Sequence, residues 1–176
     1  MKLVWDQADY IFERDDLTIV AAPIDYAPFA CQAHVVEQDT YLLLGQQTNL
    51  NDPGKPAWFL ANTLEQEKTY SPGSVVSKSH APYRLQAVIH DIERDPTYCI
   101  ETVKLAYHNV MKIVQIRQLF SLAMPLLGTV HGKLSINESI LLLMDVLNNR
   151  SPDALKKLWL IIPIECDKKC LSLIVE

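Results

Sequence analysis

The chain has 176 residues, of which 49% are hydrophobic and 21% charged; this length and composition predict one domain over 1–176 and exclude a mostly disordered chain. The formal net charge of −5 excludes general nucleic-acid binding through a basic surface, and no apolar run reaches the roughly 18 residues of a membrane-spanning helix. Acidic residues at Asp6 and Asp9 exclude an N-terminal signal sequence, and the cysteines lack the spacing of a disulfide framework, so a reducing cytoplasm and no membrane partner are expected.

The first part of the chain, residues 1–70, is rich in predicted strands. Residues 17–22, LTIVAA, are apolar almost throughout, which is typical of a strand covered on both faces. Two runs separated by Gln38 and Asp39 predict a hairpin, and Pro56, after a polar loop, suits the first turn of a helix. The predicted elements are strands over 3–5, 10–13 and 17–22, a hairpin of strands over 31–37 and 40–44, a loop over 46–55 and a helix over 56–68.

The second part alternates strands with the two clearest helices. Asp95 is a suitable N-cap and Pro96 a suitable first residue for a helix that ends near Arg117. Ser135 and Glu138 have the spacing of a capping box at the start of the next helix. This pattern predicts an α/β domain with one mixed sheet and helices on its faces. The remaining predicted elements are strands over 74–78, 85–90, 119–124, 158–164 and 171–175 and a helical turn at 151–152.

One loop, residues 128–134 (GTVHGKL), connects an apolar strand to the capped helix. In open α/β sheets, ligands bind outside the carboxyl ends of the strands, and a helix N-terminus offers N–H groups and partial positive charge to a phosphate. Glycine permits close approach of the backbone, and Lys133 adds a positive charge. The alternative is an ordinary strand-to-helix connection in which glycine serves the turn. The predicted phosphate-binding residues are Gly128, Thr129, Val130, His131, Gly132 and Ser135.

Four segments, in order, resemble the second half of a macro domain. The resemblance covers residues 71–164 and implies a three-layer α/β/α sandwich with a mixed central sheet and a loop that wraps the phosphates of ADP-ribose or a related nucleotide. The apolar residues near the end of the chain separately predict a closing strand within 170–176. The matching segments are PGSVV (72–76), VIH (88–90), AYHNV (106–110) and PLLGT (125–129), against the family's "tGeav" strand, "viHav" strand, "AyrnaL" helix and "PalGtGifGfP" loop.

The first part departs from that family. Residues 19–23, IVAAP, resemble the family's "IVNAAN" strand but lack the asparagines that serve its hydrolysing members. Residues 25–29 stand in place of its Gly-rich loop, and Val130 replaces a glycine, although a β-branched residue disfavours positive φ. These departures favour ligand binding without catalysis, and no catalytic residue, cofactor or metal site is predicted. Further residues of the pocket wall are expected to be Ala22, Asp25 and Pro125.

Three functions are consistent with the sequence. The preferred one is a non-catalytic module that binds a small phosphorylated metabolite or nucleotide. The second is a structural or protein-interaction domain that has lost the ligand site, and the third is a hydrolase of a substrate containing ADP-ribose or phosphate. His90 and Asp91 are adjacent, but a catalytic pair needs a nucleophile, so a strand-end histidine bonded to the backbone is expected. The histidines show no metal-ligand spacing.

Overall fold

The structure is a computed structural model that describes residues 10–44, 69–166 and 168–174. The strand expected over 3–5, the loop over 46–55 and the helix over 56–68 therefore lie outside the described residues.

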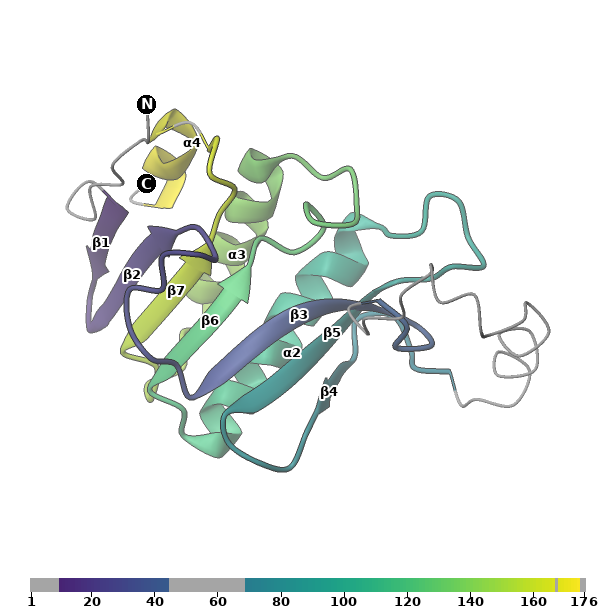
Figure 1. The fold of residues 1–176 in the computed structure, drawn as a ribbon, viewed down its shortest axis with the longest axis horizontal. Helices are drawn as coiled ribbons and strands as arrows, with labels where there is room; N and C mark the ends of the chain where they lie inside the picture. The colour runs from purple at the N-terminus through teal and green to yellow at the C-terminus, as the bar shows by residue number, and fades with distance from the viewer. Residues whose placement is uncertain (1–9, 45–68, 167, 175–176) are drawn as a thin grey trace.

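Seven strands form one mixed sheet in the order β1-β2-β7-β6-β3-β5-β4 (Figure 1). The five inner strands run parallel, and the two edge strands, β1 and β4, run antiparallel to their neighbours. The inner strands are nearly all buried, as expected when both faces of a parallel sheet are covered. The strands are β1 (Ile11–Arg14), β2 (Leu17–Ala22), β3 (Ala33–Asp39), β4 (Val75–Ser77), β5 (Tyr83–His90), β6 (Ser121–Pro125) and β7 (Lys157–Ile161).

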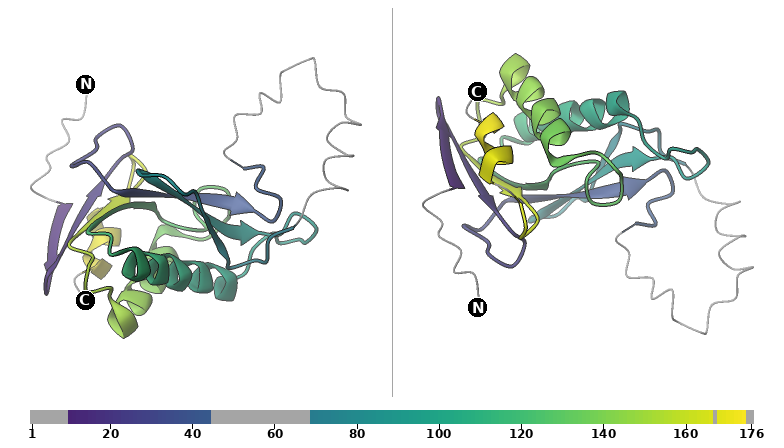
Figure 2. Two further views of the ribbon diagram at one scale, coloured as in Figure 1. Left: turned by 90° about the horizontal axis from the view of Figure 1, so that it is seen from below. Right: turned by 90° about the horizontal axis from the view of Figure 1, so that it is seen from above.

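The described helices lie on one face of this sheet (Figure 2). The long helices α2 (Ile100–Arg117) and α3 (Ile136–Arg150) pack against each other, and α2 also packs on β5. The short α4 (Lys168–Leu171) and the 3-10 turn η2 (Ser172–Ile174) pack against α3. The order of elements predicted along residues 71–164, strand-strand-helix-strand-helix-strand, is confirmed. The two helices of this segment lie on the same face of the sheet.

The opposite face carries a smaller apolar cluster around Trp159. Alternate residues of a strand point to opposite faces, so Leu158 and Leu160 join the main core while Trp159 packs on the other side with Ala22. The Trp159 ring nitrogen donates to the Ala22 carbonyl at 3.0 Å. Cys31, from the connection between β2 and β3, packs against this cluster, and burial raises the pKa of its thiol to about 11. It therefore packs as a protonated thiol at neutral pH.

The hairpin expected over 31–44 is wrong. β3 is a central strand that pairs in parallel with β5 and β6, and residues 40–44 form no strand. The cause is the Asp39 carboxylate, which accepts N–H bonds from Tyr41 at 2.7 Å, Leu43 at 3.1 Å and Leu44 at 2.8 Å. These bonds turn the chain away from the sheet, as aspartate side chains commonly do in turns.

Two element boundaries also differ from expectation. Helix α2 begins at Ile100 with Cys99 as its N-cap, not at the expected Asp95 and Pro96. The strand expected within 170–176 is wrong, because α4 and η2 occupy residues 168–174. Leu171 and Ile174 are both buried in the main core, and residues three apart share one side of a helical segment but not of a strand.

Candidate functional site

The loop between β6 and α3 is anchored in the core at both ends. Leu127 and Leu134 are buried, at 0% and 7% exposed. Between them the Leu134 N–H donates to the Gly128 carbonyl at 3.1 Å, and Gly128 has φ +85°. A positive φ favours glycine, so Gly128 serves the turn geometry directly. The capping box is also confirmed: Glu138 N–H donates to Ser135 Oγ at 3.2 Å, and Ser135 N–H donates to Glu138 Oε2 at 3.0 Å.

The N–H groups of this loop bind a side chain of the protein itself. Glu37 Oε1 accepts from Gly128 N–H at 2.6 Å and from Val130 N–H at 3.4 Å, and Glu37 Oε2 accepts from His131 N–H at 3.1 Å. Glu37 lies in β3, which runs parallel and next to β6, so its side chain reaches the loop that follows β6. The N–H groups of Gly128, Thr129, Gly132 and Ser135 are expected to face solvent or a bound anion. This is wrong for Gly128, which donates to Glu37, for Thr129, which donates to the Leu126 carbonyl, and for Ser135, which donates to Glu138.

A buried histidine completes the environment of Glu37. His90, at the end of β5 and 2% exposed, places Nε2 3.2 Å from Glu37 Oε2 and Nδ1 3.1 Å from Thr97 Oγ1. A carboxylate only accepts hydrogen bonds, so Nε2 carries the proton of this contact. Asp91 forms its ion pair with Arg94 at 3.0 Å. The His90 ring is thus bonded to side chains rather than to the backbone, and the adjacent Asp91 is not its partner in those bonds.

Glu37 is a residue of this site that the local sequence pattern does not predict, although the sequence carries one signal for it. An ionised carboxylate is rarely buried unless it is paired or hydrogen-bonded, and Glu37 follows the apolar Val35 and Val36 in the sequence. An acidic residue that directly follows two valines in a strand is a position that, when buried, needs several hydrogen-bond donors. The three donors from 128–131 lie more than 90 residues away, so local patterns do not identify them.

The hydroxyls predicted to bind phosphate are also engaged within the protein. Thr129 Oγ1 donates to the Leu126 carbonyl at 2.7 Å, and Ser135 Oγ belongs to the capping box. The Lys133 N–H donates to Tyr98 Oη at 3.0 Å. Val130 is 56% exposed, so its side chain does not fill a cleft. The exposed rim of the loop therefore consists of the Val130, His131 and Lys133 side chains.

The residues expected in the pocket wall are not all brought to this loop. Pro125 ends β6, directly before it. Ala22 is buried at the end of β2, which β7 separates from β6, and Asp25 is exposed in the turn that follows. The strand that ends beside the loop is β3. The equivalence expected between 19–23 and the family's "IVNAAN" strand stays a prediction, but these residues do not lie beside the loop.

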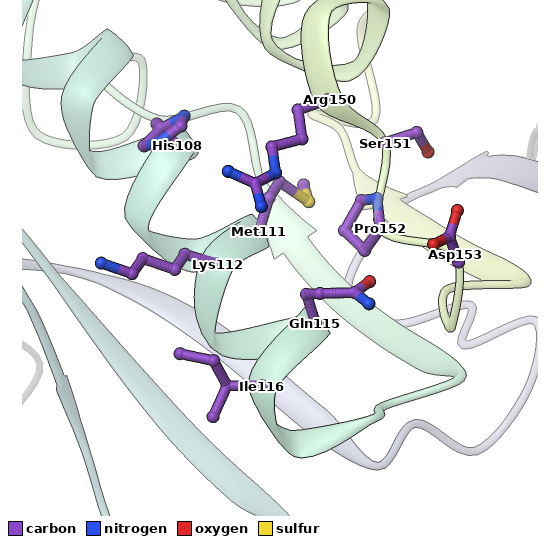
Figure 3. A pocket seen from close by; sticks show the side chains of 9 residues that line it. All are labelled: His108, Met111, Lys112, Gln115, Ile116, Arg150, Ser151, Pro152 and Asp153. Atoms are coloured by element: carbon purple, nitrogen blue, oxygen red, sulfur yellow. The ribbon is translucent and has the colours of Figure 1, made fainter.

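Several hollows lie along the described helices and strand ends. One, of about 220 Å³, lies at the same edge as the loop and is lined by hydroxyls and acids, including Tyr41, Tyr70, Asp91 and Glu93. A larger one, of about 370 Å³, lies at the C-terminal ends of α2 and α3 (Figure 3), where Arg150 extends toward α2. Because the loop precedes the N-terminus of α3, the larger hollow is remote from the candidate site.

Within the described ranges, no group of three or more His, Cys, Asp or Glu side chains could hold a metal ion. None of the helices that the structure describes is both long and apolar enough to cross a membrane.

Comparison with known proteins relates this fold to macrodomains. No family model matches the sequence, and no curated protein matches it. A macrodomain variant of Oceanobacillus iheyensis with ADPR (ADP-ribose) has a TM-score of 0.64 at 16% identity, covering 94% of this chain and 94% of that one. The Oceanobacillus iheyensis macrodomain with ADP has a TM-score of 0.63 at 16% identity, covering 94% and 92%. The Trypanosoma brucei macrodomain in complex with ADP has a TM-score of 0.61 at 13% identity, covering 91% of this chain and 69% of that one.

These similarities show that the chain has the macrodomain fold. The α/β class with a mixed central sheet, and the resemblance drawn from residues 71–164, are thereby confirmed. The similarity also extends to the divergent first part of the chain, since 94% of its length is covered.

Proposed function

We propose that this chain is a single-domain, non-catalytic binding module for a small phosphorylated nucleotide of the ADP-ribose type. The observation that carries the proposal is the position of the loop over 126–135. It leads from the carboxyl end of a parallel strand directly to the capped N-terminus of α3, the place where α/β sheets bind phosphorylated ligands. Macrodomain structures that hold ADPR or ADP share this fold, which supports the ligand class.

The exposed rim offers the groups through which such a ligand would first make contact. Lys133 supplies a cation and His131 an imidazole, and both are exposed. The net charge of −5 supports a small ligand over a nucleic acid, whose binding depends on an extended basic surface. A cytoplasmic location, where nucleotides are available, is part of the same proposal.

The absence of catalysis rests on how the polar groups near the loop are engaged. The carboxyl end of β3 carries Glu37, Gln38 and Asp39, and no asparagine. The Glu37 carboxylate is held by loop N–H groups and the Asp39 carboxylate by the turn after β3. A general base must be within reach of the proton that it removes, and neither carboxylate is available for this.

A second function is favoured by one specific observation. Glu37 already accepts from the Gly128, Val130 and His131 N–H groups, so these three groups have an acceptor without a ligand. This supports a structural or protein-interaction domain that retains the fold and has lost the phosphate site.

Calorimetric titration with ADP-ribose, AMP and inorganic phosphate separates the two functions. We expect ADP-ribose to bind saturably. Val130→Glu should weaken binding by at least tenfold, because it places a carboxylate on the exposed rim. The matched control is Ile116→Glu, which adds the same charge at a residue 70% exposed near the far end of α2. No saturable heat with any of the three ligands would favour the interaction domain.

A further inference from the structure

The Glu37 side chain has the surroundings of a bound anion. It is 4% exposed, and its described partners are all donors: three backbone N–H groups at 2.6, 3.4 and 3.1 Å and the His90 Nε2 at 3.2 Å. Successive backbone N–H groups that converge on one point form the concave sites in which proteins hold phosphate and other anions. Here the carboxylate of the chain itself lies at the point of convergence.

These hydrogen bonds stabilise both the buried Glu37 carboxylate and the N–H groups that bind it. A buried carboxylate is strongly unfavourable unless several donors compensate it. Buried N–H groups without an acceptor are likewise destabilising. Each backbone N–H has one hydrogen, so the groups that bind Glu37 cannot at the same time bind an external anion with good geometry. A second negative charge close to the buried carboxylate would also be repelled.

We propose that Glu37 is an internal anion that occupies the phosphate subsite of this loop, so that an external phosphate or carboxylate competes with it for the N–H groups of Gly128, Val130 and His131. The inference rests on the proposed function only in naming that loop as the phosphate subsite. It implies that the wild-type chain binds phosphorylated ligands more weakly than its fold permits, and that removing Glu37 creates a site for a small anion.

The test is chemical rescue of Glu37→Ala. Urea unfolding is measured in sodium formate, acetate and phosphate against sodium chloride of equal ionic strength. We expect the variant to be less stable than the wild type in chloride. Its urea midpoint should rise saturably with formate or phosphate, whereas the wild-type midpoint should not change between salts.

The matched control is Gln38→Ala, the next residue of β3. Gln38 is fully buried and polar and binds the Leu44 carbonyl, so its removal should destabilise the fold without creating an anion site. Equal responses of the two alanine variants to formate would overturn the inference. So would a wild-type chain that responds as strongly as Glu37→Ala.

If Glu37→Ala does not fold, Glu37→Ser keeps a small polar side chain at this position and removes the carboxylate that accepts the loop N–H bonds. We expect this variant to bind ADP-ribose at least tenfold more tightly than the wild type. Equal affinity of both would overturn the inference and leave the proposed function in place. Anion rescue of Glu37→Ala without ADP-ribose binding by any of these forms would support the inference and overturn the proposed function.

Discussion

Tyr107 and Ser139 join the two long helices to a single residue of the loop, Leu127. The Tyr107 hydroxyl lies 2.7 Å from Ser139 Oγ and accepts the Leu127 N–H at 2.7 Å, while Ser139 Oγ donates to the Leu127 carbonyl at 2.7 Å. Because Ser139 donates to Leu127, Tyr107 must donate to Ser139, which closes a ring of three hydrogen bonds. Both side chains are fully buried, and burial raises the pKa of Tyr107 far above its ordinary value, so the phenol remains a donor at physiological pH.

Tyr107→Phe should destabilise the protein by about 1–3 kcal/mol, because it leaves the buried Leu127 N–H without its acceptor and Ser139 without its donor. Urea unfolding measures the change. The control is Tyr83→Phe, which keeps the ring against Arg117, 4.4 Å from its guanidinium carbon, and should change stability by less than about 0.5 kcal/mol. Equal losses in the two variants would show that the hydroxyl ring contributes little.

The two glycines of the loop should respond differently to alanine. At Gly128, where φ is +85°, alanine would adopt a left-handed conformation, at a cost of about 1–2 kcal/mol. At Gly132, a Cβ would collide with the Gly128 carbonyl oxygen, the acceptor of the Leu134 N–H, so the loop must rearrange. Position in a loop alone predicts that Gly132→Val leaves the fold intact, but this collision predicts a disturbed loop.

Amide NMR spectra distinguish these two effects. Gly128→Ala should lose stability and retain the wild-type shift of the Lys133 amide. A Cβ there would lie 3.0 Å from Leu134 Cδ2, and Tyr98, the acceptor of the Lys133 N–H, is not among its nearest neighbours. Gly132→Ala should move the Leu134 and Lys133 amides. Unchanged amide shifts in Gly132→Ala would contradict the close approach of the two glycines.

The parts of the fold that local patterns encode were predictable. LTIVAA gave β2 with its observed bounds, and the spacing of Ser135 and Glu138 identified the start of α3. The start of α2 was misplaced because Asp95 and Pro96 satisfy the local rules for a helix start, whereas the chain from Asp91 to Thr97 closes a loop through an N–H bond of 2.6 Å.

The candidate site depends on contacts that local patterns do not encode. The residues 128–135 were identified from their place before a helix. The partner of their N–H groups, Glu37, lies in β3. The sequence around Gln38 and Asp39 is equally typical of a hairpin turn. Only the pairing of β3 with β5 and β6 brings Glu37 under the loop.

We expect no hydrolysis of ADP-ribosylated protein or of ADP-ribose phosphate esters. The carboxylates at the end of β3 are held by hydrogen bonds, and His90 is 2% exposed between Glu37 and Thr97, so neither these carboxylates nor His90 is free to orient water or ribose. Product release is measured against a buffer blank. Turnover above the blank that is lost in Glu37→Gln or His90→Gln would contradict this expectation and favour the hydrolase.

The start of α3 should be sensitive to acid. The hydrogen bonds from the Ser135 side chain and backbone lower the pKa of the Glu138 carboxyl below its usual value. A group whose pKa is lowered by folding stabilises the folded state above its unfolded pKa, about 4.3 for glutamate, and loses this contribution as pH falls through the folded pKa. The stability of the wild type relative to Glu138→Gln should therefore be constant near neutral pH and decline below about pH 4.3.

Glutamine is the informative substitution, because its carbonyl still accepts the Ser135 N–H in a capping box while it does not titrate. Urea unfolding of both forms from pH 7 to pH 3 gives the difference directly. The control is Asn137→Gln, a change at an exposed neighbour that leaves the capping box intact, and its difference from the wild type should not vary with pH. A wild-type advantage over Glu138→Gln that grows as the pH falls would contradict the lowered pKa, since protonation removes the negative charge that favours a helix N-terminus.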